Sequence, residues 1–132
     1  MKSKKVLVLC TGNSCRSIIA EAILKAEGIN AMSAGSNPSG RVNPNAKRVL
    51  EENGIWDEFY SKSIDEVKDI DFDLVVTVCD NAKETCPVFP KKTKTIHIPF
   101  KDPEGKGYEE FVKTYSEIKS KLLPVVRDLL KT

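Results

Sequence analysis

The stretch of sequence that determines the architecture of this protein is Val6-Leu7-Val8-Leu9-Cys10-Thr11-Gly12-Asn13-Ser14-Cys15-Arg16-Ser17. Its apolar first half predicts a buried strand over Lys5–Leu9, and the periodic apolar residues that follow predict a helix over Ser17–Ala26. A loop closed between a strand and a helix points successive backbone N–H groups inward, where they form a nest for a tetrahedral oxyanion. The stretch therefore predicts an anion-binding loop at one edge of a sheet.

Two side chains give this loop its predicted chemistry, Cys10 at the end of the strand and Arg16 at the start of the helix. Arg16 can bind two oxygens of the anion at once, and the positive field of the loop favours the thiolate of Cys10. A cysteine that merely ends a strand is the ordinary alternative, but Gly12 and the helix favour a nucleophile. The predicted substrate-binding residues are Thr11, Gly12, Asn13, Ser14, Cys15, Arg16 and Ser17.

Strand and helix patterns alternate along the rest of the chain. Apolar runs and turn residues predict strands over Asn30–Ala34, Phe72–Val78 and Thr95–Phe100, and helices over Asn43–Glu52, Ser63–Glu66 and Tyr108–Leu130. We expect Pro124 to kink or divide the last helix. The alternation predicts one α/β domain over residues 1–132, with three layers: a four-stranded parallel sheet flanked by helices on both faces.

Length and charge restrict the partners of this domain. The chain has 132 residues and a net charge of +2, from 21 Lys and Arg against 19 Asp and Glu. This balance predicts neither nucleic acid nor an anionic membrane as a partner. The apolar stretch after Lys5 is too short for a secretory signal, so we expect a cytoplasmic protein with reduced cysteines. A monomer is the default expectation.

Three residues outside the loop are further candidates for chemistry. Asp102 follows the last predicted strand, where it can protonate a departing oxygen, although Asp-Pro is also a common turn. Cys79 follows the strand Phe72–Val78, and six residues separate it from Cys86. Zinc ligands are usually closer together, which leaves a redox pair. If the strands that precede Cys10 and Cys79 are neighbours, their ends lie roughly 5 Å apart, within reach of a disulfide.

The motif Cys10–Ser17, together with Cys79, Cys86 and Asp102-Pro103, resembles the thioredoxin-coupled arsenate reductases, which share the fold of the low-molecular-weight protein tyrosine phosphatases. The match spans the chain. The Cys10–Ser17 motif alone is shared with the phosphatases, and the pair Cys79 and Cys86 narrows the assignment. The resemblance implies a cytoplasmic enzyme of arsenical resistance.

The resemblance also implies an order of steps. Arsenate binds in the loop, Cys10 attacks arsenic, and Asp102 protonates the leaving oxygen. Cys79 then attacks Cys10, and arsenite departs. Cys86 attacks Cys79, and thioredoxin reduces the resulting Cys79–Cys86 disulfide. The electron count agrees, because arsenate to arsenite takes two electrons and one disulfide supplies two.

A cation and two other functions are part of the same prediction. No cofactor is required, but some reductases of this family bind potassium, and the matching positions are Asn13, Glu21, Ser36 and Asp65. A tyrosine phosphatase is the main alternative function, and a non-catalytic redox sensor is the third. The segment Glu104–Gly107 is charged and rich in glycine, which suits a small inorganic anion better than a phosphotyrosine ring.

Overall fold

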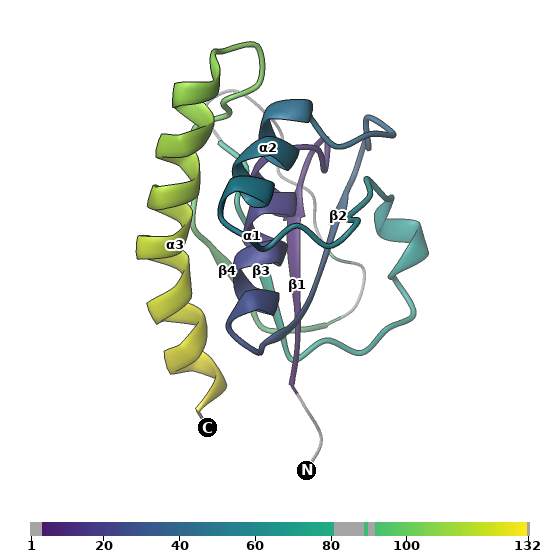
Figure 1. Cartoon of the computed structure of the whole chain (residues 1–132). Coiled ribbons are helices and arrows are strands. Elements are labelled where there is room, and N and C mark those ends of the chain that lie inside the picture. Colours follow the sequence, from purple (N-terminus) through teal and green to yellow (C-terminus); the bar gives the residue numbers. More distant parts are fainter. Residues whose placement is uncertain (1–3, 81–88, 90–91, 132) are drawn as a thin grey trace.

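The sheet has four parallel strands in the order β2-β1-β3-β4 (Figure 1). The computed structural model describes residues 4–80, 89 and 92–131. The strands are β1 (Lys5–Cys10), β2 (Asn30–Gly35), β3 (Leu74–Thr77) and β4 (Thr95–His97). The helices of the described residues are α1 (Arg16–Ala26), α2 (Pro44–Glu52), α3 (Tyr108–Leu130) and the short 3₁₀ helix η1 (Ile64–Glu66).

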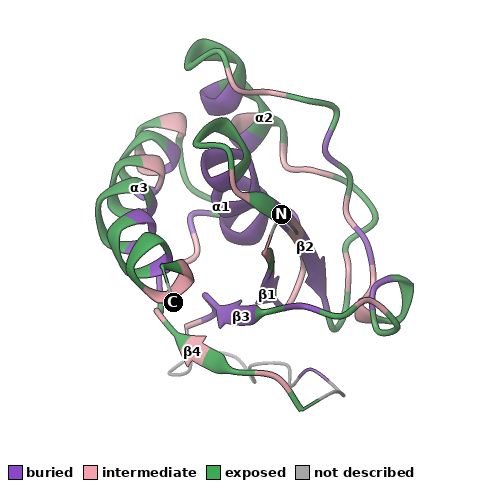
Figure 2. Ribbon diagram, turned by 90° about the horizontal axis from the view of Figure 1, so that it is seen from below, coloured by how far each residue is buried: buried purple, intermediate pink, exposed green. Residues whose placement is uncertain are grey.

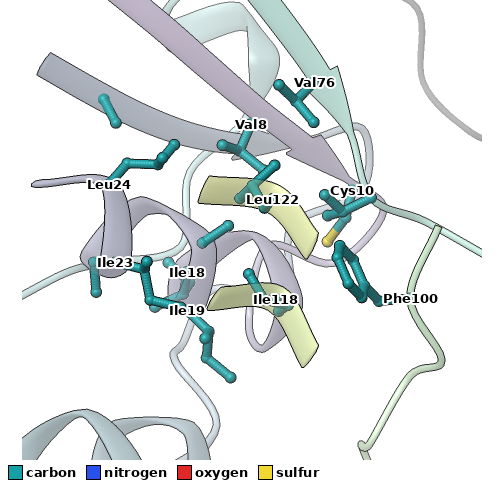
Figure 3. Close-up of a cluster of buried hydrophobic side chains, with 14 of the residues drawn as sticks. Val8, Cys10, Ile18, Ile19, Ile23, Leu24, Val76, Phe100, Ile118 and Leu122 are labelled. Carbon is teal, nitrogen blue, oxygen red and sulfur yellow. The ribbon is translucent and has the colours of Figure 1, made fainter. Parts of the chain in front are cut away.

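The central strand β1 is buried on both of its faces, as its continuous apolar sequence predicts. Val8 and Cys10 face a large core formed with α1 and α3, whereas Leu7 and Leu9 belong to a second, smaller core. Figure 3 shows the larger core, in which Val8 and Leu122 lie between the sheet and the helices and Cys10 lies beside Phe100. The loop that follows β1 is therefore held by packing on both sides of the sheet.

The two faces of the sheet are covered differently (Figure 2). The α-helices α1, α2 and α3 pack against one another on the side of the larger core. On the other side, among the described residues, the cover is η1 with the segment that follows it, in which Val67 and Phe72 are buried and Phe72 meets Phe89 edge to face at 5.6 Å. The predicted α/β fold with a four-stranded parallel sheet is confirmed, with a 3₁₀ helix on the second face.

Helix α3 continues through Pro124 from Tyr108 to Leu130. Of the two predicted effects of Pro124, a kink or a division, the division is wrong. Leu122 and Val126, on either side of the proline, are fully buried against the larger core, while Pro124 itself faces solvent. Packing of this apolar stripe keeps the helix continuous where the missing N–H would otherwise end it. None of the helices in the described ranges is long and apolar enough to cross a membrane.

The buried stripe of α3 makes a stability prediction. Leu122→Ala removes a side chain that is 0% exposed, and we expect it to lower the free energy of unfolding by about 2–5 kcal/mol because a cavity remains. Urea denaturation measures the loss. Val125→Ala, on the exposed side of the same helix, is the matched control and should change stability by less than about 0.5 kcal/mol. Equal losses in the two variants would contradict this packing.

Candidate active site

The loop between β1 and α1 lies at the carboxyl end of the central strand. The backbone carbonyls of Thr11, Gly12 and Ser14 accept hydrogen bonds of 2.9–3.0 Å from N–H groups of segment 37–43. The carbonyls are thus held on the outside of the loop, which is the arrangement that an inward-facing nest of amides requires. The hydroxyl of Ser61 donates a further hydrogen bond to the Gly12 carbonyl at 3.2 Å.

Gly35, at the end of β2, allows the loop to lie against the sheet. A Cβ atom at this position would lie 2.4 Å from the Thr11 carbonyl oxygen and 3.1 Å from the Asn13 nitrogen. Both contacts are to backbone atoms, so no side-chain rotation relieves them. Only glycine permits this approach between the loop and the sheet.

Asn13 lies at the centre of the loop's hydrogen bonds. Its φ of 47° is a left-handed conformation, which asparagine adopts more readily than most residues. Its Oδ1 accepts a hydrogen bond from the Lys62 backbone N–H at 2.7 Å, and its Nδ2 donates to the hydroxyls of Ser17 at 2.8 Å and Ser33 at 2.9 Å. The side chain therefore fixes a strained backbone position from three directions.

These hydrogen bonds also orient the Ser17 hydroxyl. Ser17 Oγ accepts from Asn13 Nδ2, and it lies 3.3 Å from the sulfur of Cys10. Either atom can donate in this contact, and the hydroxyl proton of Ser17 is available to Cys10 because Asn13 uses only an acceptor site of the oxygen. Cys10 is 2% exposed and is a free cysteine.

Arg16 and Asp102 meet above the loop. Arg16 is 3% exposed, and its Nη1 donates to the Phe100 carbonyl at 3.1 Å, which anchors the guanidinium to the segment after β4. Its Nη2 lies 3.6 Å from Asp102 Oδ2. Asp102 is 40% exposed and also accepts the Glu104 backbone N–H at 3.0 Å. The same residue therefore forms the turn and presents a carboxyl group to the pocket.

The pocket at this edge has a volume of about 350 Å³. It brings together Asp102 and six of the predicted loop residues, Cys10, Thr11, Gly12, Ser14, Cys15 and Arg16, whereas Asn13 and Ser17 do not line it. It is also lined by Asn37, Pro38 and Ser39, which the sequence analysis did not identify as site residues. Glu104, from the charged and glycine-rich segment Glu104–Gly107, also lines the pocket. Its Oε1 accepts a hydrogen bond from the Ser14 hydroxyl at 3.4 Å.

Cys15 differs sharply from Cys10 although both belong to the loop. Burial raises the pKa of the Cys15 thiol to about 12, and the carboxylates of Asp102 and Glu104 act in the same direction. The hydrogen bond with Ser14, at 3.6 Å, opposes this only in part. Cys15 therefore stays protonated at neutral pH.

Cys79 lies at the end of β3, next to β1. The Val78 N–H donates to the Leu9 carbonyl at 2.9 Å, and the two strands are neighbours, which is the condition under which their ends lie within reach of a disulfide. Cys79 is fully buried in the same core as Cys10, and it is disulfide-bonded, whereas Cys10 and Cys15 are free. Cys86 lies outside the described residues.

Two of the predicted potassium ligands, Asn13 and Glu21, are connected through Ser33. The Ser33 hydroxyl donates to Glu21 Oε1 at 2.6 Å and accepts from Asn13. Ser36 and Asp65 are exposed, and Asp65 Oδ1 lies 3.9 Å from Lys68 Nζ.

The surroundings of Glu21 already contain two cations. Its Oε1 lies 3.9 Å from Lys62 Nζ and its Oε2 lies 3.2 Å from Lys25 Nζ. A potassium ion beside this carboxylate would meet two ammonium groups at short range. The residues present therefore do not fit a resident potassium ion. Burial lowers the pKa of Lys62, while the Glu21 carboxylate acts in the opposite direction.

The chain belongs to the low molecular weight phosphotyrosine protein phosphatase family, whose model matches residues 5–132. Within this family it is similar to the arsenate reductase of Brevibacillus brevis, with 41% identity over 92% of this chain and 94% of the relative. Among solved structures it is similar to the arsenate reductase of Archaeoglobus fulgidus, with 33% identity, a TM-score of 0.82 and coverage of 92% and 98%. A low molecular weight protein tyrosine phosphatase from T. tengcongensis has 27% identity and a TM-score of 0.75, with coverage of 96% and 99%.

The contact between Gly35 and the loop predicts the effect of one added methyl group. Gly35→Ala should displace the Thr11 carbonyl and weaken binding of sulfate to the loop by about 10- to 100-fold, as expected for a displaced binding group. Isothermal titration calorimetry with sulfate measures this. Gly107→Ala, where a Cβ meets nothing within 4 Å, is the control and should bind sulfate as the wild type does. Unchanged affinity in Gly35→Ala would contradict the contact.

The raised pKa of Cys15 predicts its reactivity. With Cys15 protonated far above neutral pH, iodoacetamide should label it slowly at pH 8. Its labelling rate should rise about tenfold per pH unit for as long as the protein stays folded, because the thiolate fraction rises in that proportion. Mass spectrometry of the labelled peptide follows the rate. A plateau in the Cys15 rate between pH 8 and 9 would contradict the raised pKa.

Proposed function

We propose that this protein reduces arsenate to arsenite, with Cys10 as nucleophile and with Cys79 and Cys86 as the relay that leads to thioredoxin. The observation that carries the proposal is the pair of cysteines at the ends of neighbouring strands. Cys10 is a free thiol within the oxyanion loop, and Cys79 is a disulfide-bonded cysteine in the same buried core. The relatives named arsenate reductase support the substrate.

Arsenate, a tetrahedral oxyanion, would bind to the loop amides of Thr11–Ser17 and to Arg16. The guanidinium is held by Phe100 and lies beside the pocket, so it needs little reorganisation to receive two oxygens. Ser17 would hold the sulfur of Cys10 in place through their contact at 3.3 Å. Asp102, 3.6 Å from Arg16, would supply a proton to the departing oxygen.

The chemistry balances within the protein's own thiols. Cys10 Sγ forms a bond to arsenic, and one oxygen leaves as water with the proton from Asp102. Cys79 then attacks Cys10 Sγ, and the sulfur–arsenic bond breaks with its electron pair left on arsenic, which departs as arsenite. Two thiols have become one disulfide, and arsenic has gained two electrons.

The relay then returns Cys10 to its thiol form. Cys86 would attack Cys79, which moves the disulfide away from the nucleophile, and thioredoxin would reduce it. The exchange leaves Cys10 reduced while Cys79 is oxidised. The free thiol of Cys10 and the disulfide bond of Cys79 support this step of the proposal. We further propose that the protein works as a cytoplasmic monomer in arsenical resistance.

A tyrosine phosphatase is the second candidate function, because the same loop serves both reactions and the phosphatase from T. tengcongensis shares the fold. The pocket favours the reductase. It is lined by Asn37, Pro38, Ser39 and Glu104 without an aromatic residue in the described part of its wall, and a phosphotyrosine ring requires apolar or aromatic contact. A phosphatase would also make no use of Cys79 in its chemical steps.

The relay is tested by two serine variants. Cys86→Ser should release about one equivalent of arsenite per protein and then stop with thioredoxin as reductant, because the Cys10–Cys79 disulfide has no resolving thiol. Cys79→Ser should release none. Quantification of arsenite over time measures both, and mass spectrometry of the oxidised protein maps the paired cysteines.

Hydrolysis of an aryl phosphate is the matched control. Both variants should retain the wild-type rate of this reaction, since only the loop and Asp102 take part in it. Continued turnover by Cys86→Ser with thioredoxin alone would contradict the relay. Equal loss of both reactions in Cys79→Ser would instead show that the variant damages the fold of the loop.

A further inference from the structure

The Lys62 side chain lies in a buried site built from acceptors. It is 4% exposed, and its Nζ donates to the backbone carbonyls of Ser33 at 2.9 Å and Tyr60 at 3.3 Å. Glu21 Oε1 lies 3.9 Å away, and the Tyr60 ring centroid lies 4.5 Å away. Two carbonyls, a carboxylate and a ring face all attract positive charge. The surroundings are those of a cation site, and the ammonium group fills it.

This cation site is connected to the nucleophile by a continuous series of hydrogen bonds. Glu21 accepts from the Ser33 hydroxyl, Ser33 accepts from Asn13 Nδ2, and Asn13 Nδ2 also donates to Ser17, which contacts Cys10. The position of the Glu21 carboxylate therefore orients the Ser33 hydroxyl and, through it, the amide of Asn13.

Lys62 holds the same network from a second side. Its backbone N–H donates to Asn13 Oδ1 at 2.7 Å while its ammonium group compensates Glu21. Lys62 thus contacts both Asn13, through its backbone N–H, and Glu21, through its ammonium group. Without the ammonium group, Lys25 would remain beside Glu21, but its side chain is 41% exposed and reaches the other carboxylate oxygen. Solvent screens that contact much more than the buried one.

We propose that Lys62 is a positioning residue whose ammonium group serves as the internal cation of the oxyanion loop, so that the order of the loop does not depend on a metal ion. The proposal rests on the proposed role of the loop as an oxyanion site, and not on the arsenate chemistry. A residue that merely covers the surface would leave both anion binding and the response to potassium unchanged on substitution.

The wild-type protein provides the first test. Its melting temperature and its affinity for sulfate, added as the Tris salt, are compared in KCl and in choline chloride at equal ionic strength. We expect the same values in both salts, because the ammonium group already occupies the cation site. A saturable rise in melting temperature or in sulfate affinity with KCl alone would overturn the proposal.

The second test removes the ammonium group. Lys62→Ala leaves Glu21 uncompensated, and we expect a melting temperature lower by about 5 °C and sulfate binding weaker by about tenfold in choline chloride. KCl should partly restore the melting temperature and the sulfate affinity of Lys62→Ala, because a potassium ion can enter the site that the ammonium group has left. Lys25→Ala is the matched control, and it should bind sulfate as the wild type does and show no response to potassium.

Two other outcomes for Lys62→Ala would overturn the proposal. Unchanged sulfate affinity in Lys62→Ala would overturn the positioning role. Weaker binding without rescue by KCl would overturn the cation role, because it would assign the effect to the lost aliphatic chain. None of these measurements depends on arsenate reduction. A protein without a working cysteine relay would therefore still give the expected melting temperatures and sulfate affinities.

A double variant keeps the proposal testable if Lys62→Ala does not fold. Glu21→Gln with Lys62→Ala removes both charges, so no buried carboxylate is left without its counterion. The double variant should fold, and its sulfate affinity should not respond to KCl. If Lys62→Ala also folds, the double variant should bind sulfate more tightly than Lys62→Ala. A double variant that binds sulfate no more tightly than a folded Lys62→Ala, or that responds to KCl, would overturn the proposal.

Discussion

The left-handed backbone of Asn13 is the constraint on which the oxyanion loop depends. A non-glycine residue at a φ of 47° persists only where its surroundings hold it there. Three hydrogen bonds from its side chain do so, to Lys62, Ser17 and Ser33. Each of these partners comes from a different part of the fold. The loop therefore keeps its shape because the sheet, helix α1 and the segment before η1 are all in place.

The parallel sheet places the chemical groups at one edge. β1 ends in Cys10, and the neighbouring β3 leads directly to Cys79. β4 lies on the far side of β3, and the segment after it brings Phe100 and Asp102 to Arg16. The carboxyl ends of parallel strands meet at the same edge, so residues far apart in the sequence come together at this edge of the sheet. The close approach at Gly35 brings the end of β2 to the same place.

The features predictable from the sequence are those with local causes. The strand over Lys5–Cys10, the loop after it and the capping box of Ser63 and Glu66 depend on neighbouring residues, and the structure contains all three. Pro124 shows the limit of a local rule, because burial of the residues around it outweighs its missing N–H. Asp102 was predictable only as a candidate, since its contact with Arg16 depends on how β4 ends.

Lys62 could not be predicted as a buried cation at all. A lysine next to a polar Ser63 is typical of a solvated surface, and its contact with Asn13 joins residues 49 positions apart. Family resemblance pointed to a potassium ion near Glu21, and the negative charge of that residue is indeed buried. The compensating charge is supplied by the chain itself. The sequence indicated that a cation compensates the buried charge of Glu21. Only the tertiary structure shows that this cation is the ammonium group of Lys62.

The two loop cysteines show how environment separates chemical roles within one motif. Burial raises the pKa of Cys15 to about 12, and the carboxylates of Asp102 and Glu104 act in the same direction. Cys10 receives the hydroxyl of Ser17, which Asn13 has oriented. Both are buried free thiols, five positions apart. Each thiol contacts a serine hydroxyl, but only the serine beside Cys10, the proposed nucleophile, is itself held by Asn13. The network that ends at Lys62 and Glu21 holds Asn13 in turn.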